Sequence, residues 1–109
     1  MEFAEELYVG ETVEALGTIV YSLRREIPIF RLYCIVLFCD KDRMEILSSK
    51  ELFTKKYEHR QKILVGVAMG RQEAISLFAF MLEDALKEGK NPASPSSWFP
   101  KKCKESAFP

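Results

Sequence analysis

The sequence contains few of the residues from which metal sites and catalytic sites are usually built. Among its 109 residues there are one histidine, His59, and three cysteines. A structural zinc site needs four ligands, usually thiolates and imidazoles, and no closely spaced set of them occurs here. Cys34, Cys39 and Cys103 are odd in number and irregularly spaced, so all three thiols are expected to be free. No metal or cofactor is expected.

The sequence also lacks an excess of either charge and any long apolar run. Its 16 basic and 16 acidic residues give a formal net charge of zero, whereas dedicated nucleic-acid binders usually carry a basic excess. No apolar run approaches the roughly 20 residues of a transmembrane helix, so no membrane partner is expected. Residues 1–8 contain three glutamates and no lysine or arginine, unlike the basic start of a signal peptide. A cytoplasmic location is therefore expected.

The composition is typical of one globular domain. Hydrophobic residues make up 48% and charged residues 29% of the chain, unlike the balance of disordered chains. The composition changes after Gly89, because residues 90–109 contain four prolines and four serines. We therefore predict a single α+β domain over residues 1–89. Residues 90–109 are predicted to be a C-terminal tail that is either docked or flexible.

Hydrophobic periodicity predicts three helices and at least three strands. The predicted helices cover residues 12–27, 49–57 and 71–88, and the predicted strands cover residues 30–38, 44–47 and 62–69. The first and last helices carry apolar residues at three- and four-residue steps, whereas the two longer strands are almost continuously apolar. Ser48 with Glu51 fits a capping box, and Gly89 fits a left-handed helix C-cap. Residues 1–9 fit either a short strand or an irregular segment.

These elements follow the order (β)αββαβα and predict an α+β fold. Strand 30–38 is expected at the centre of a three- or four-stranded, mostly antiparallel sheet, between strands 44–47 and 62–69. The helices are expected to cover one face of this sheet. If residues 5–9 form a strand, the order also fits a ferredoxin-like βαββαβ arrangement with a C-terminal helix. That arrangement carries many unrelated activities, so it does not identify a function.

Two motifs within residues 33–85 resemble a small family of uncharacterised bacterial proteins. The first is residues 44–47, MEIL, which follow a polar turn. The second is residues 65–77, VGVAMGRQEAISL, which are similar to the family's "VGIAxGxxEALELV" stretch. The resemblance covers about half of the chain. It implies no activity, cofactor or functional residue, because the family has no established activity.

The turn between strand 62–69 and helix 71–88 is the first candidate site. Gly70, Arg71 and Gln72 would place backbone N–H groups at a helix N-terminus, where the helix dipole favours an anion. Arg71 would add a charged contact. The sequence has no G-x-G-x-x-G and no P-loop pattern, and Gly70 also fits a plain tight turn. An anion-binding regulatory domain is therefore an alternative hypothesis.

An interaction surface is the function that the sequence favours. Phe80 falls on the polar arc of helix 71–88, and Trp98 and Phe99 stand in the proline-rich tail. Exposed aromatic residues are common anchors of protein interfaces. The alternative is that the tail folds back and buries Phe80. The primary hypothesis is a non-enzymatic protein-interaction domain, whose partner is a second copy in a homodimer or an unidentified protein.

Residues 50–62 provide two weaker alternatives. Their basic side chains are interleaved with Phe53 and Tyr57, a mixture that binds single-stranded nucleic acid. The basic residues are Lys50, Lys55, Lys56, His59, Arg60 and Lys62. A solvated surface explains them equally well, so nucleic acid is not expected as a partner. His59 has no partner nearby in sequence for base catalysis, and Cys39 fits a partly buried spectator better than a reactive thiol. An enzyme of unknown class is the last alternative.

Overall fold

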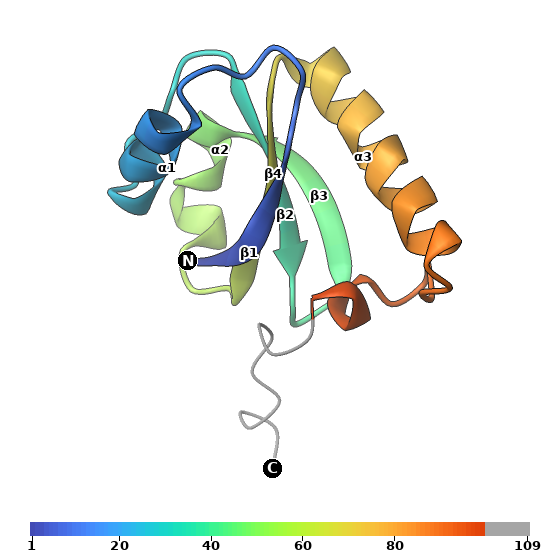
Figure 1. Ribbon diagram of the computed structural model, residues 1–109. Coiled ribbons are helices and arrows are strands. Elements are labelled where there is room, and N and C mark those ends of the chain that lie inside the picture. The colour runs from blue at the N-terminus through green and yellow to red at the C-terminus, as the bar shows by residue number, and fades with distance from the viewer. Residues whose placement is uncertain (100–109) are drawn as a thin grey trace.

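A computed structural model of the protein describes residues 1–99 and shows a four-stranded sheet between two layers of helix (Figure 1). The strands are β1 (Glu2–Val9), β2 (Leu32–Phe38), β3 (Arg43–Ser48) and β4 (Lys62–Met69). The helices are α1 (Leu16–Arg24), α2 (Ser49–Leu52) and α3 (Arg71–Lys87), with short 3₁₀ turns η1 (Lys55–Tyr57) and η2 (Pro95–Trp98). The predicted α+β class, a sheet packed with helices, is confirmed.

The sheet has the strand order β1-β4-β2-β3. β2 pairs antiparallel with both β3 and β4, whereas β1 pairs parallel with β4. Predicted strand 30–38 corresponds to β2, and its predicted position between two antiparallel neighbours is therefore confirmed. Because β1 is parallel and β2 antiparallel to β4, β1 and β2 run in opposite directions. The ferredoxin-like alternative is wrong, since the two strands of a βαβ unit run parallel.

Helices cover both faces of the sheet, so the expectation that they cover one face is wrong. Alternate residues of β2 point to opposite faces, and all of residues 34–38 are fully buried. Cys34 and Val36 belong to the core beneath α1 and α2, and Ile35 and Leu37 belong to the core beneath α3. A strand that is apolar at every position needs cover on both sides, which one layer of helices cannot supply.

The helix boundaries follow from local backbone conformation. α1 is shorter than the predicted helix because Ala15 and Glu26 both have positive φ angles, of 53° and 60°. The predicted helix 49–57 is divided, since the Thr54 hydroxyl donates a hydrogen bond to the Glu51 carbonyl at 2.7 Å. The predicted caps are present. Ser48 Oγ accepts from the Glu51 N–H, and Gly89 has a φ of 73° after the end of α3.

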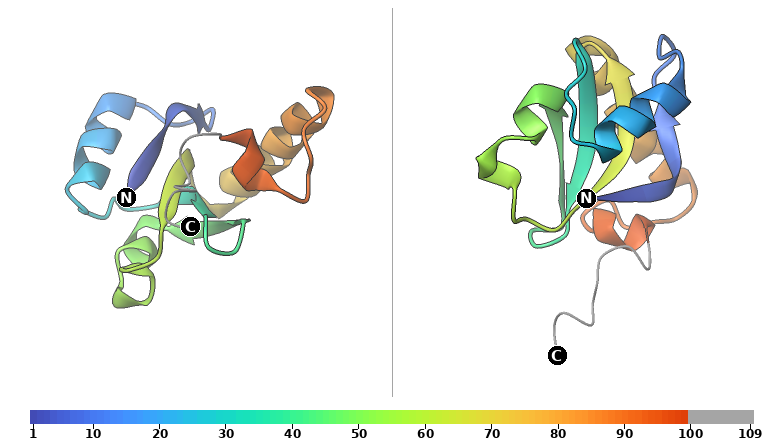
Figure 2. Two further views of the ribbon diagram at one scale, coloured as in Figure 1. Left: turned by 90° about the horizontal axis from the view of Figure 1, so that it is seen from below. Right: turned by 90° about the vertical axis from the view of Figure 1, so that its left-hand side faces the viewer.

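Residues 90–99 pack against the rest of the chain at the end of the sheet where β2 turns into β3 (Figure 2). Ser94 Oγ and the Ser96 N–H donate hydrogen bonds to the Asp42 carboxylate at 2.9 and 2.6 Å. Trp98 is 8% exposed, and its indole N–H donates to the Asn91 carbonyl. This part of the predicted tail is therefore docked. Residues 100–109 lie outside the described residues.

Candidate functional site

The connections of two neighbouring strands mark one end of the sheet as the place to look for a ligand. β1 and β4 lie side by side and run parallel, so that both end at the top of Figure 1. The chain leaves β1 towards α1 on one face, and leaves β4 directly into α3 on the other face. In α/β proteins, ligands bind in the crevice where adjacent parallel strands connect to opposite faces.

A carboxylate of the protein itself occupies this crevice. Glu73, in the first turn of α3, accepts hydrogen bonds from the Thr12 N–H, the Thr12 hydroxyl and the Met69 N–H at 3.0, 2.7 and 2.7 Å. Burial raises the pKa of the Glu73 carboxyl, but these hydrogen bonds outweigh it and hold the pKa below its ordinary value. A Cβ at Gly10 would overlap this carboxylate. The crevice is thus built for an anion that the chain already provides.

A second cavity lies on the other side of the start of α3, and we call it the basic cleft. It has a volume of about 540 Å³ and is formed by residues 28–33, the start of α2 and the start of α3. Its lining includes three cationic residues, Arg31, Lys50 and Arg71, and no acidic residue. Within residues 1–99 the ion pairs are Arg60 with Asp40 and Lys90 with Glu88, so the three cations of the cleft are unpaired there.

Hydrogen bonds to backbone groups hold the three walls of the basic cleft together. The Gly70 N–H donates to the Arg31 carbonyl at 2.8 Å, which joins the start of α3 to the segment before β2. Ser49 Oγ accepts from the Ile29 N–H and donates to the Ile29 carbonyl, both at 2.8 Å. Ser49 is only 1% exposed. The backbones that carry the three cations are therefore fixed relative to one another.

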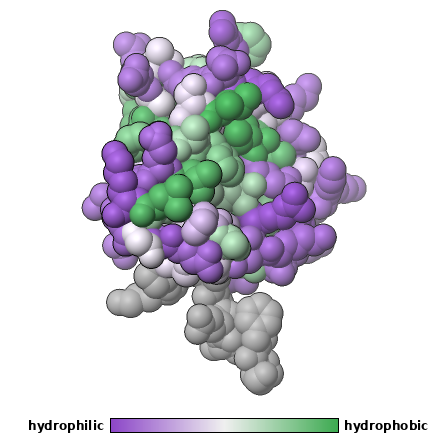
Figure 3. Space-filling model, turned by 90° about the vertical axis from the view of Figure 1, so that its right-hand side faces the viewer, coloured by the Kyte–Doolittle hydropathy of each residue, from purple (hydrophilic) through white to green (hydrophobic). Residues whose placement is uncertain are grey.

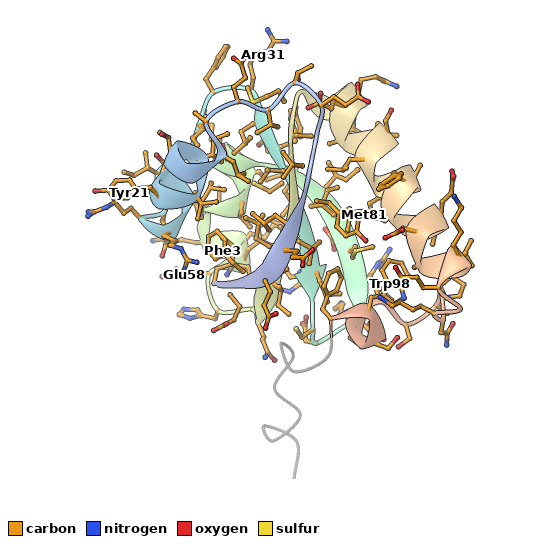
Figure 4. All side chains as sticks on the ribbon, in the orientation of Figure 1. Phe3, Tyr21, Arg31, Glu58, Met81 and Trp98 are labelled. Atoms are coloured by element: carbon orange, nitrogen blue, oxygen red, sulfur yellow. The ribbon has the colours of Figure 1, made fainter. Side chains whose placement is uncertain are left out.

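Arg31 adopts a backbone conformation that is unfavourable for arginine. Its φ is 66°, in the left-handed region that costs a residue with a Cβ about 1 kcal/mol or more. Its side chain is exposed and extends into solvent at the upper end of the molecule (Figure 4). Strained residues persist where the surrounding structure holds them, and they are concentrated at functional sites.

The basic cleft also presents apolar surface. Phe30 is 87% exposed, the largest exposed fraction among the large hydrophobic residues described. Tyr33 is half-buried and lines the same cleft. An aromatic ring at the rim of a cationic cleft can pack against the uncharged part of an organic anion. The arrangement therefore provides for both a charged group and an apolar group.

The structure brings some of the predicted anion-site residues together and leaves one apart. Gly70 and Arg71 line the basic cleft, whereas Gln72 does not. Sequence reasoning missed Arg31 and Phe30, and it assigned Lys50 to a separate basic stretch. No local pattern identifies them, because they come from segments about 20 to 40 residues away from Arg71 in the sequence.

The three predicted interface aromatics lie in different surroundings. Phe80 is 56% exposed on α3, where its ring meets that of Tyr8 edge to face at 6.1 Å. The described part of the tail leaves it uncovered. Trp98 is buried against its own chain, and Phe99 packs on the core beneath α3. Of the three, Phe80 alone is an exposed aromatic ring.

The basic stretch 50–62 does not form one surface. Arg60 pairs with Asp40 at 3.3 Å and stacks over the Phe38 ring at 3.9 Å. The Lys62 ammonium donates to the Tyr57 carbonyl at 2.6 Å, and burial lowers its pKa. Lys50 faces the basic cleft instead. Arg60 and Lys62 are therefore engaged with their own chain, whereas Lys55, Lys56 and His59 are exposed.

The cysteines differ from their prediction. Cys39 is disulfide-bonded, so the expectation that all three thiols are free is wrong, and Cys39 offers no reactive thiol in this state. Cys34 is a free, buried cysteine, and burial raises its pKa to about 12. Within residues 1–99 no group of three histidine, cysteine or carboxylate side chains is placed to hold a metal ion.

Comparison with known proteins finds no matching family model, no matching curated protein and no matching solved structure. The resemblance of residues 33–85 to a bacterial family therefore stays a prediction. None of the helices in residues 1–99 is long and apolar enough to cross a membrane. The case for function rests on the geometry of the described residues.

Proposed function

We propose that the protein is a non-enzymatic binding domain whose basic cleft holds a small organic anion, such as a phosphorylated metabolite. The observation that carries this proposal is that Arg31, Lys50 and Arg71 are all among the residues that line one cleft, whose lining includes no acidic residue. The three come from three separate segments that hydrogen bonds hold in place. The cleft volume falls within the range of roughly 300–1,000 Å³ usual for small-molecule sites.

The charges of the cleft suit a phosphate group. Two arginines can each offer paired N–H donors to phosphate oxygens, and the lysine adds a compact positive charge. Without a ligand, the three like charges repel one another, and an anion would relieve this repulsion. Phe30 and Tyr33 favour a ligand with an apolar or aromatic portion over free phosphate.

The lining of the cleft supports binding over catalysis. It includes no histidine, cysteine or carboxylate, so it lacks the most common general bases. The Ser49 hydroxyl is already used in both directions by the Ile29 backbone. A bound anion would thus be held and released unchanged, as in a ligand-sensing or regulatory domain.

The test is binding of a panel of anions to the wild-type protein and to matched variants. The panel contains inorganic phosphate, sulfate, nucleotides and sugar phosphates. A ligand at a hundred times its dissociation constant stabilises the fold by about 2.7 kcal/mol, which raises the unfolding midpoint of a domain this size by about 10 °C. Titration calorimetry then gives the dissociation constants.

Two variants remove charge from the cleft, and one removes charge elsewhere. Arg71→Ala and Arg31→Asn are each expected to weaken binding roughly 10- to 100-fold, the loss of a charge-assisted hydrogen bond. Asparagine tolerates the left-handed backbone at position 31. Lys87→Ala, about 24 Å away at the other end of α3, should bind as the wild type does. The proposal would be refuted if no anion of the panel raised the unfolding midpoint, or if all three variants lost affinity equally. Binding confined to oligonucleotides would favour nucleic acid instead.

A cytoplasmic location belongs to this proposal, with a condition set by Cys39. Disulfides are rare in the reducing cytosol, so we expect the Cys39 bond to be open in that compartment. Alkylating thiols in intact cells before lysis measures this directly. A labelled Cys39 supports a cytoplasmic location, and a Cys39 protected from labelling contradicts it.

A further inference from the structure

The two edges of the sheet are protected unequally against pairing with another chain. β1 and β3 are the edge strands, and an edge strand presents unpaired backbone groups on which another strand can add. β1 carries three exposed glutamates and a register shift between Phe3 and Tyr8, and both features discourage pairing. β3 pairs with β2 from Arg43 to Ser48 without a register shift. β3 therefore lacks the register shift, although it carries two charged residues, Arg43 and Glu45.

The face of α3 next to β3 carries exposed apolar side chains. The opposite flank of α3 meets the β1 side, through Glu73 with Thr12 and through Asp84 with Tyr8. Residues two positions later lie about 200° further round the helix, on the flank towards β3. These are Ile75, 41% exposed, and Leu86, 53% exposed. Figure 3 shows hydrophobic residues gathered in a band across the face that α3 covers.

The edge strand itself continues this apolar character on the same face. Met44 and Ile46 of β3 are half-buried and pack on the core beneath α3. Arg43 and Glu45 point to the other face, since side chains alternate along a strand. Neither Arg43 nor Glu45 takes part in the ion pairs of residues 1–99. The edge therefore offers unpaired charges of both signs beside an apolar strip.

We propose that β3 pairs with β3 of a second copy of this chain, antiparallel, around a two-fold axis at Met44. The pairing would run over residues 43–45 of each copy, because residues 46–48 would face the turn 40–42 of the second copy. It would join the edges of the two four-stranded sheets with both α3 helices on the same face. A two-fold interface of this kind is closed and self-complementary. The residues that would pair, 43–45, do not line the basic cleft, so the dimer can be tested independently of the proposed ligand.

Charge complementarity selects the register. Directly opposite residues of an antiparallel pair point to the same face, so an axis perpendicular to the sheet must pass through a residue position. An axis at Glu45 would set the two Glu45 side chains against each other, and an axis at Ile46 would leave both charges without a partner. An axis at Met44 places Arg43 opposite Glu45 of the second copy twice, with the two methionines in contact.

Charge reversal tests this register directly. The full-length wild-type chain is expected to show a concentration-dependent dimer by sedimentation velocity. Arg43→Glu and Glu45→Arg each create like-charge pairs twice in the dimer, and each is expected to raise the dimer dissociation constant about tenfold or more. The double variant Arg43→Glu/Glu45→Arg restores opposite charges and should return the constant to within about threefold of the wild-type value.

A matched control reverses charge on the other edge. Glu5→Arg on β1 is expected to leave the dissociation constant unchanged, and thermal unfolding shows whether each variant is folded. The proposal is overturned by a monomer at every concentration, by a dimer that Glu5→Arg disrupts, or by a double variant as weak as the single ones. A dimer that both single reversals weaken and the double reversal restores supports it.

Discussion

Replacing Gly10 with alanine is expected to destabilise the fold by about 2 kcal/mol through Glu73. The backbone of Gly10 has no positive φ, so alanine itself fits the conformation. Its Cβ would overlap the Glu73 carboxylate, and the carboxylate would have to leave its three donors at Thr12 and Met69. At about 1 kcal/mol for each hydrogen bond, reduced by their partial exposure to solvent, the loss is about 2 kcal/mol.

A double-mutant cycle separates this mechanism from a general effect of the substitution. Glu73→Ala alone should cost a similar amount, because it leaves the same donors without an acceptor. In the double variant Gly10→Ala/Glu73→Ala the three atoms nearest to the added methyl group, all of the Glu73 side chain, are gone. Its cost should be close to that of Glu73→Ala alone, which gives a coupling energy of at least about 1 kcal/mol.

Urea-induced unfolding of the four proteins measures these free energies. Equal slopes against urea concentration would show that the variants unfold from comparable native states. Additive costs within about 0.5 kcal/mol would refute the reasoning, because they would show that Gly10 and Glu73 do not act on one another. A control substitution, Gly17→Ala, meets nothing within 4 Å and should stabilise α1 by up to about 1 kcal/mol.

Three further predictions concern other features of the fold. Arg31→Gly should raise the free energy of unfolding by about 1 kcal/mol by relieving the left-handed backbone, and should weaken anion binding in the same titrations as Arg31→Asn. Cys34 should resist alkylation in the native protein and react only on unfolding, because it is buried and its pKa is raised to about 12; mapping of the labelled peptide checks this. The lowered pKa of Glu73 stabilises the fold above the ordinary carboxyl pKa, and this contribution is lost as pH falls through the folded-state value. Glu73→Gln should therefore flatten the acid limb of stability against pH, and an unchanged limb would contradict the assignment.

Local sequence signals were sufficient for most of the elements. Residues 62–69 form the predicted strand with the same bounds, because continuous apolar residues between polar ones leave few alternatives. The Ser48 and Gly89 caps depend on neighbours within a few residues. The pairing of β1 depends on distant residues instead, since Glu2 lies opposite Ile63. No local pattern specifies a partner so far along the chain. A strand over residues 1–9 was therefore one of two alternatives, and its parallel pairing with β4 was not predicted.

The candidate site was predictable only in the part that one segment supplies. Gly70 and Arg71 stand together in the sequence and predicted an anion at the start of α3. The positive φ of Arg31 depends on how the chain enters β2, and its carbonyl is used by the Gly70 N–H. Nothing in the residues around Arg31 indicates either property. The basic cleft exists because three separate turns meet at one end of the sheet.

Glu73 determines on which side of the α3 start an external anion can bind. Its carboxylate lies at the ends of β1 and β4 and takes the Met69 and Thr12 donors there. A second anion in that crevice would meet a like charge. On the other side of the same turn, Arg31 and Arg71 are unpaired among the described residues. Substitutions at Glu73 should therefore act mainly on stability and substitutions at the two arginines mainly on binding, a separation that a ligand bound between β1 and β4 would not produce.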